Sequence, residues 1–151
     1  MLELRPADRV LEIGCGPGVA ASLIAARLTD GSMTAIDRSP TAIARTAARN
    51  ADHLASGRLI LQEATLAGFR SDQRFDKALA VNVNVFWTTR AAAECRALQA
   101  VLAPDGLVHL VYDGPGDASE RVAATLRGQG FAATVRRGPQ PGLVCITGRP
   151  A

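Results

Sequence analysis

The chain of 151 residues has almost no lysine and no concentrated basic surface. Lys77 is its single lysine, so arginine carries nearly all the positive charge, and Arg136-Arg137 is the only adjacent basic pair. The formal net charge is +3, and aromatic residues make up 4% of the chain. Nucleic-acid binding needs clustered basic residues, often interleaved with aromatic ones, so the composition gives it little support.

The sequence also lacks the spacings of metal sites, disulfide frameworks and nucleophile turns. Its three cysteines, Cys15, Cys95 and Cys145, are an odd number without metal-ligand spacing, and we expect reduced thiols in a cytoplasmic protein. The two histidines are His53, expected to be exposed near a helix end, and His109, expected to pack on a sheet. No P-loop or Gly-x-Ser-x-Gly turn is present.

No secretory leader or membrane-spanning run is found, because residues 1–6 are too short and polar for either. The content of 48% hydrophobic and 21% charged residues is ordinary for a soluble globular protein. We therefore expect one domain over residues 1–151, with no membrane partner.

Strand and helix patterns alternate along the chain, which predicts an α/β fold with a mostly parallel sheet. Short apolar runs bounded by turn residues predict about seven strands, at 9–13, 32–36, 58–62, 77–81, 107–112, 131–136 and 143–147. Helical patterns cover residues 19–28, 40–50, 89–102 and 117–128. Ser39 is the expected N-cap of the second helix, with Pro40 at its first position.

Residues 10–18, Val-Leu-Glu-Ile-Gly-Cys-Gly-Pro-Gly, are the most informative segment. They predict a buried strand, a glycine-rich turn and the start of a helix, with Glu12 two positions before the first glycine. The nicotinamide fingerprint Gly-x-Gly-x-x-Gly fits poorly, because Val19 occupies its third glycine position and Glu12 would approach a pyrophosphate. A tight turn without any ligand is the other alternative.

A carboxylate suits S-adenosylmethionine (SAM), which carries an α-ammonium and a sulfonium but no phosphate. The segment resembles the first motif of the class I SAM-dependent methyltransferases, (Asp/Glu)-x-Gly-x-Gly-x-Gly, with matches at Glu12, Gly14, Gly16 and Gly18 and with Cys15 inside the turn. The resemblance implies a Rossmann-like, doubly wound, seven-stranded sheet. Its helices lie on both faces, and its last strand is antiparallel.

Further cofactor-binding residues follow from the resemblance at the ends of the second and third strands. Asp37 is expected to accept hydrogen bonds from both ribose hydroxyls, the alternative being an acid favoured by a helix N-terminus. Arg38 is expected along the adenine face or, equally, in solvent. Glu63 and the backbone N–H of Ala64 are expected to contact adenine.

The segment around Glu63 departs from the family pattern, because Gln62 replaces a glycine and Gly68 a proline. Asn82, after the fourth strand, takes the position where relatives hold the methionine part of the cofactor through the backbone. Asn84, Trp87, Tyr112 and Asp113 lie on loops expected to border the methyl group, although a core or helix-start position for Trp87 is also open. The catalytic residues are not assigned.

These features predict a SAM-dependent methyltransferase. No Asn-Pro-Pro-Tyr motif follows the fourth strand, which favours a small-molecule oxygen, nitrogen or carbon acceptor. Only eight residues precede the predicted first strand, so we expect this domain to lack most of the N-terminal lid helices usual in the family. The alternative is a non-catalytic module that binds SAM or S-adenosylhomocysteine (SAH), or one subunit of a homo-oligomer that completes an open site. A nicotinamide-binding dehydrogenase fragment is a third, disfavoured possibility.

Overall fold

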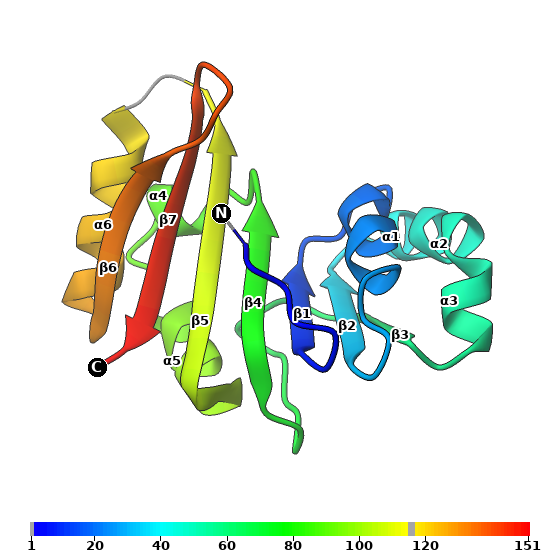
Figure 1. The fold of residues 1–151 in the computed structure, drawn as a ribbon. Helices are drawn as coiled ribbons and strands as arrows, with labels where there is room; N and C mark the ends of the chain where they lie inside the picture. Colours follow the sequence, from blue (N-terminus) through cyan, green and yellow to red (C-terminus); the bar gives the residue numbers. More distant parts are fainter. Residues whose placement is uncertain (1, 115–116) are drawn as a thin grey trace.

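The computed structural model describes residues 2–114 and 117–151, which form a seven-stranded sheet flanked by helices on both faces (Figure 1). The strand order is β3-β2-β1-β4-β5-β7-β6. The strands are β1 (Arg9–Ile13), β2 (Ser32–Asp37), β3 (Leu59–Glu63), β4 (Phe75–Val81), β5 (Leu102–Asp113), β6 (Phe131–Arg137) and β7 (Leu143–Pro150). The first five are parallel, whereas β7 is antiparallel to β5 and β6. The predicted Rossmann-like fold class is confirmed.

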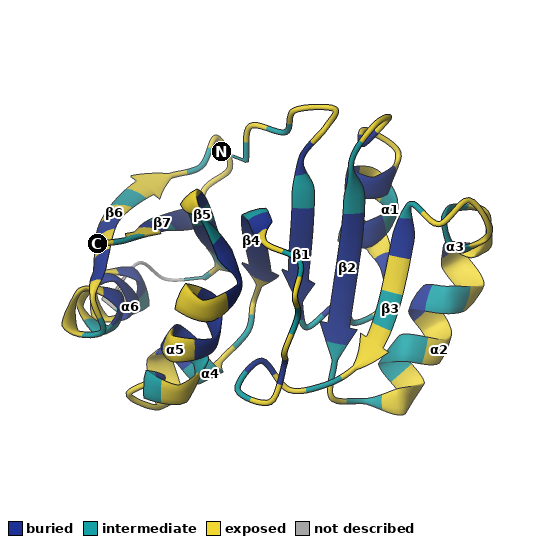
Figure 2. Cartoon of the chain, turned by 90° about the horizontal axis from the view of Figure 1, so that it is seen from below, coloured by how far each residue is buried: buried dark blue, intermediate teal, exposed yellow. Residues whose placement is uncertain are grey.

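The helices divide between the two faces of the sheet. The elements α1 (Val19–Ala25), α2 (Pro40–Arg49) and α3 (Ala51–Ala55) pack over β1, β2 and β3. The elements α4 (Val85–Thr88), α5 (Ala92–Val101) and α6 (Asp117–Gly128) cover the opposite face. The central strands β1, β2 and β4 are buried between these layers, as their near-continuous apolar sequences predicted (Figure 2).

Several element boundaries differ from those expected. Strand β5 begins at Leu102, five residues before the predicted strand at 107–112, and pairs with Phe75 before a register shift. Gly106 fits there because a Cβ would lie 2.8 Å from the carbonyl oxygen of Phe75. A short helix, α4, was not predicted, and α1 ends at Ala25 rather than Leu28. Pairing with β4 decided the start of β5, which local propensity does not encode.

One part of the sheet has no helix above it among the described residues. On the α1–α3 side, no helix of the described chain covers β5, β7 and β6, and the N-terminal segment passes across β4 (Figure 1). There the single lysine, Lys77, forms a buried ion pair with Asp8. His109, on β5, is 4% exposed, as its apolar neighbours predicted.

None of the described helices is long and apolar enough to cross a membrane. Cys15, Cys95 and Cys145 are buried and free, as expected from their number and spacing.

Candidate functional site

The glycine turn lies at the carboxyl edge of the sheet, where the parallel strands end, and it is hydrogen-bonded to β2. Gly14, Gly16 and Gly18 have φ angles of 71°, 52° and 79°, a left-handed conformation that glycine adopts readily. The N–H groups of Gly14 and Cys15 both donate to the carbonyl of Ile36, at 2.8 and 3.1 Å. Helix α1 begins directly after the turn, so the strand-turn-helix predicted from the sequence is present.

Three carboxylates share one face of the sheet at this edge. Glu12 is in register with Ala35, and Asp37 is in register with Glu63. Side chains alternate between faces along a strand, so residues 35 and 37 point the same way, and their register partners point with them. The structure thus brings Glu12, Asp37 and Glu63 to the α1–α3 side of three adjacent strands.

Glu12 is the most deeply buried of the three carboxylates. The residue is 3% exposed, and its Oε2 atom is buried without a hydrogen-bond partner among the described residues. Burial, together with the negative charge of Asp37, raises the pKa of Glu12 to about 8. A buried, unpaired carboxyl next to a second acid is unfavourable unless a cation or donor compensates it.

Asp37 connects the glycine turn to α2. Its Oδ2 accepts the N–H of Gly16 at 3.1 Å, and its Oδ1 accepts the N–H of Ser39 at 2.9 Å. Ser39 in turn caps α2 through Ala42, as predicted. A carboxylate has about four acceptor positions, so Asp37 retains capacity for two further donors.

Helix α2 holds the outer side of the turn through polar side chains that the sequence reasoning missed. Thr46 Oγ1 donates to the carbonyl of Gly16 at 3.0 Å, and Arg49 Nε donates to that of Pro17 at 2.9 Å. Asn50 Nδ2 donates to the carbonyl of Gly18 at 3.1 Å. Thr46 and Asn50 are both buried and lie four residues apart, and this polar i, i+4 pair on a buried helix face was the available signal.

The predicted adenine-contacting residues lie beside Asp37 but differ in what they can offer. The N–H of Ala64 donates to the carbonyl of Asp37 at 3.0 Å, so it is already engaged in extending the sheet. Glu63 is exposed and has an open carboxylate. Arg38 is exposed, and no interaction of its side chain is present within the described residues, so both of its expected positions stay open.

The segment after β4 meets the glycine turn from the other side. Asn82 has φ 54°, and its Oδ1 accepts the N–H of Asp113 at 3.0 Å. A Cβ on Gly14 would lie 2.9 Å from Cγ2 of Val83, so the two segments are in contact. The predicted methionine-binding position at Asn82 therefore adjoins the turn.

The four residues expected near the methyl group lie on this side, but only some are available to a ligand. Tyr112 Oη donates to the carbonyl of Val83 at 2.9 Å, and burial raises the pKa of Tyr112. Trp87 lies in α4 and is 39% exposed, so the core alternative is wrong for it. Its Nε1 donates to Oδ1 of Asn84 at 3.1 Å. Asp113, at the end of β5, is exposed.

The residues present fit SAM better than a dinucleotide. Buried Glu12, with an unpaired oxygen beside Asp37, matches an ammonium group and would repel a pyrophosphate. A Cβ on Gly16 would meet no atom within 4 Å, so the turn leaves open space in front of its backbone. No group of three or more metal-ligating side chains was found in the described part of the chain.

The strand order and the carboxyl-edge site define the class I methyltransferase fold. Residues 10–106 match the family model described as "Methyltransferase domain", and the chain belongs to this family. Membership confirms the resemblance seen in the sequence and SAM as the cofactor.

Individual proteins give the same picture. Trans-aconitate 2-methyltransferase of Streptomyces avermitilis is 30% identical over 113 residues, covering 75% of this chain and 41% of the relative. The SAM-dependent methyltransferase SibL has a TM-score of 0.79 at 19% identity, over 96% of this chain and 51% of that one. The DhpI–SAH complex has a TM-score of 0.76 at 19% identity, over 97% and 78%. The chain thus spans less than half the length of the curated relatives it matches.

Substitution of Gly16 tests whether the open space in front of the glycine turn holds the ligand. Replacing Gly16 by Ala is expected to lower stability by about 1–2 kcal/mol, the strain of a left-handed alanine. SAM binding should weaken at least about tenfold, because the methyl group enters the ligand space. Thermal unfolding and calorimetry measure the two effects.

Gly18 is the matched comparison. A Cβ there would lie 2.8 Å from Cα of Thr46, so Gly18→Ala should unfold the domain more readily than Gly16→Ala. Equal SAM affinity for Gly16→Ala and the native chain would show that no ligand lies against this turn.

Proposed function

We propose that this domain transfers the methyl group of SAM to a small-molecule acceptor. The observation that carries the proposal is the pair formed by buried Glu12 and Asp37 at the carboxyl edge, next to the open backbone of Gly16. Both carboxylates lie where a ligand with a cationic amino group and two hydroxyls would satisfy them. The neighbouring Glu63 and the Asn82 turn extend the same edge.

In this proposal the side chains bind and orient the cofactor rather than activate it. Glu12 neutralises the α-ammonium, Asp37 accepts the ribose hydroxyls, and α2 keeps the glycine turn in place through Thr46 and Asn50. When bound, SAM supplies a methyl group already activated by its sulfonium. With SAM held there, an acceptor lone pair would form the new bond to the methyl carbon as the carbon–sulfur bond breaks, leaving SAH. An acceptor that arrives protonated would also release its proton to solvent, whereas a carboxylate has none to release.

No candidate general base stands out at this edge among the described residues. The hydroxyl of Tyr112 is bound to a carbonyl, and His109 lies below the edge with its Nδ1 3.2 Å from Thr147. Proximity and alignment are therefore the main contributions we assign to the protein. An acceptor that arrives deprotonated, such as a carboxylate, needs no base.

A small organic acceptor is supported by the relative from Streptomyces avermitilis, whose name states that it methylates trans-aconitate. Two apolar side chains near the carboxyl edge, Val81 at the end of β4 and Trp87 in α4, expose 40% and 39% of their surface. We propose that a further segment or a second copy covers these apolar side chains. The same openness favours the second candidate function, a module that binds SAM or SAH without turnover.

A methyl-transfer assay separates the two candidates. The chain is incubated with SAM labelled on its methyl group and a panel of small carboxylic acids, amines and phenols, and labelled product and SAH are measured together. Equal amounts of product and SAH, both abolished by Asp37→Ala, support the methyltransferase. Tight SAM binding without product from any acceptor supports the non-catalytic module.

A further inference from the structure

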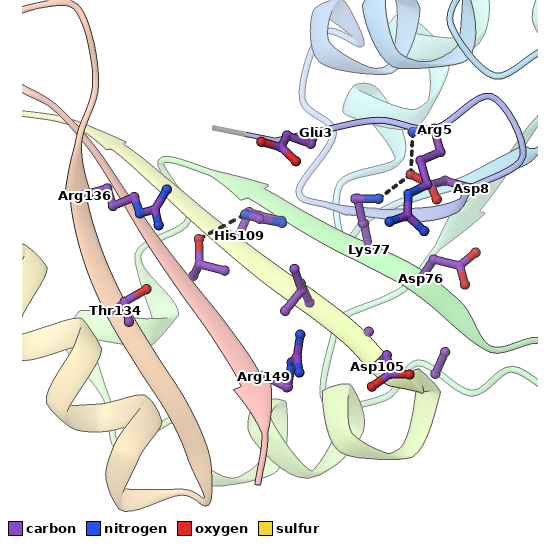
Figure 3. A pocket seen from close by; sticks show the side chains of 14 residues that line it. Glu3, Arg5, Asp8, Asp76, Lys77, Asp105, His109, Thr134, Arg136 and Arg149 are labelled. Carbon is purple, nitrogen blue, oxygen red and sulfur yellow. Dashed lines mark hydrogen bonds and ion pairs between the residues drawn. The ribbon is translucent and has the colours of Figure 1, made fainter.

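The uncovered sheet face carries a cavity that the proposed methyl-transfer site does not use. It has a volume of about 630 Å³ and lies over β5, β7 and β6, with the N-terminal segment as one wall (Figure 3). Small-molecule sites usually measure roughly 300–1,000 Å³. Its lining includes Asp76 and Asp105 at the beginnings of β4 and β5, far along the sheet from the carboxyl edge.

A row of polar side chains forms the floor. Thr134 is in register with Thr147, which is in register with His109, so the three residues share one face across β6, β7 and β5. Arg136 and Arg149 lie two positions from this row, on its two sides, and belong to the same face. Figure 3 shows both arginines beside the row.

Polar residues alternating along an antiparallel hairpin are often only a solvated face. His109 argues for more than solvation here. It is 4% exposed, its Nδ1 lies 3.2 Å from Oγ1 of Thr147, and its Nε2 is buried without a partner in the described structure. When Nδ1–H donates to Thr147, the hydroxyl proton of Thr147 can point to a ligand or to Sγ of Cys145, 3.8 Å away.

The carboxylates where the N-terminal segment meets β4 are already paired with cations. Asp8 is paired with Lys77, and Asp76 accepts from Arg9 through both the backbone N–H at 2.8 Å and the guanidinium at 3.5 Å. These two carboxylates therefore do not neutralise the arginines on the hairpin.

The hairpin arginines are unmatched. Arg136 and Arg149 are exposed, and neither forms an ion pair within residues 2–114 and 117–151. Glu3 and Arg5 lie on the N-terminal segment, and Asp105 lies at the start of β5, at the same end of the cavity as Arg149 (Figure 3). The cavity thus has a cationic side on β6 and β7 and a mixed side on the N-terminal segment.

We propose that this cavity binds the phosphate or carboxylate group of a small molecule between Arg136 and Arg149, above the hydroxyls of Thr134 and Thr147. Planar guanidinium groups match both oxyanions and bind them through paired hydrogen bonds. Strand β6 is the fourth neighbour of β1, roughly 19 Å away at sheet spacing, so this site is separate from the SAM site.

The test titrates the chain with inorganic phosphate and, separately, with citrate at constant ionic strength, followed by amide NMR shifts. Saturable binding in the millimolar range is expected, with the largest shifts at Thr134 and Thr147. The double variant Arg136→Gln/Arg149→Gln should bind at least about tenfold more weakly. Arg121→Gln, an exposed arginine on α6 on the other face, should bind like the native chain.

Preference for phosphate assigns a phosphate ester, and preference for citrate assigns a carboxylate. Two results overturn the proposal: no saturation by either anion, or equal affinity of the double variant and the native chain. Thr147→Val, which keeps the side-chain shape, gives a second variant should the double variant fold poorly. SAM affinity is measured on the same samples, because its loss would contradict the proposed function while leaving the anion site in place.

Discussion

Glu12→Gln is expected to stabilise the SAM-free domain at pH 8 while it weakens SAM binding. In the native chain the pKa of Glu12 is about 8, against 4.5 for an unperturbed glutamate, because the carboxyl is buried beside Asp37. The folded state therefore favours the protonated acid, a contribution that is complete below pH 4.5 and lost as the pH rises to about 8. The amide introduced by Glu12→Gln stays neutral at every pH.

Denaturant unfolding at several pH values measures the first effect. The difference in free energy of unfolding between variant and native chain should grow from near zero at pH 4.5 to about 2–4 kcal/mol at pH 8 in favour of the variant. A pH-independent difference would show that Glu12 is not held protonated in the folded domain.

Calorimetry measures the second effect. Loss of a charge-assisted contact, worth about 1.5–3 kcal/mol, should weaken SAM binding roughly 10- to 100-fold in Glu12→Gln. In the native chain, affinity should rise with pH between about 5.5 and 7, where Glu12 must lose its proton and the α-amino group of SAM stays charged. The variant should lack this rise, and unchanged affinity would remove Glu12 from the site.

Asp37→Ala is expected to reduce SAM affinity by at least about 100-fold with a much smaller effect on folding. Two hydrogen bonds from ribose hydroxyls to a carboxylate are lost, each worth about 1.5–3 kcal/mol. The variant also loses the bonds to the N–H groups of Gly16 and Ser39, so a fall in stability of about 1–2 kcal/mol should accompany it.

Asp72→Asn is the matched control for Asp37, because Asp72 is an exposed acid between β3 and β4, away from the carboxyl edge. Its SAM affinity should equal that of the native chain. The account of Asp37 fails if Asp37→Ala binds SAM as the native chain does, or if its weaker binding is matched by unfolding at the assay temperature.

The sequence predicts the elements of this fold best where the spacing of apolar residues and the turn or cap residues beside them indicate the same element. The strand at 9–13 has the predicted bounds, and Ser39 caps α2 as expected. It predicts less well where a neighbouring strand decides the structure, as in β5, whose first residues pair with Phe75 across a proline and a glycine. Antiparallel insertion of β7 came from family resemblance, since periodicity carries no strand order.

For the site, the sequence predicts which residues reach the carboxyl edge, because parallel strands end there together. It does not predict what those residues already bind. The N–H of Ala64 is used by Asp37, and the hydroxyl of Tyr112 by Val83, through contacts between segments distant in the sequence. Thr46 and Asn50 bind turn residues 30 and 32 positions away in the chain, so only the i, i+4 spacing of these polar residues on one helix face indicates the contacts in the sequence.

The most direct test of the central claim is calorimetry of the native chain with SAM, SAH and NAD in parallel. We expect one site with micromolar-range affinity for SAM and SAH and no measurable binding of NAD, because Glu12 matches a cationic group and disfavours a pyrophosphate beside it. Binding of NAD, or absence of SAM and SAH binding by the folded chain, would contradict it.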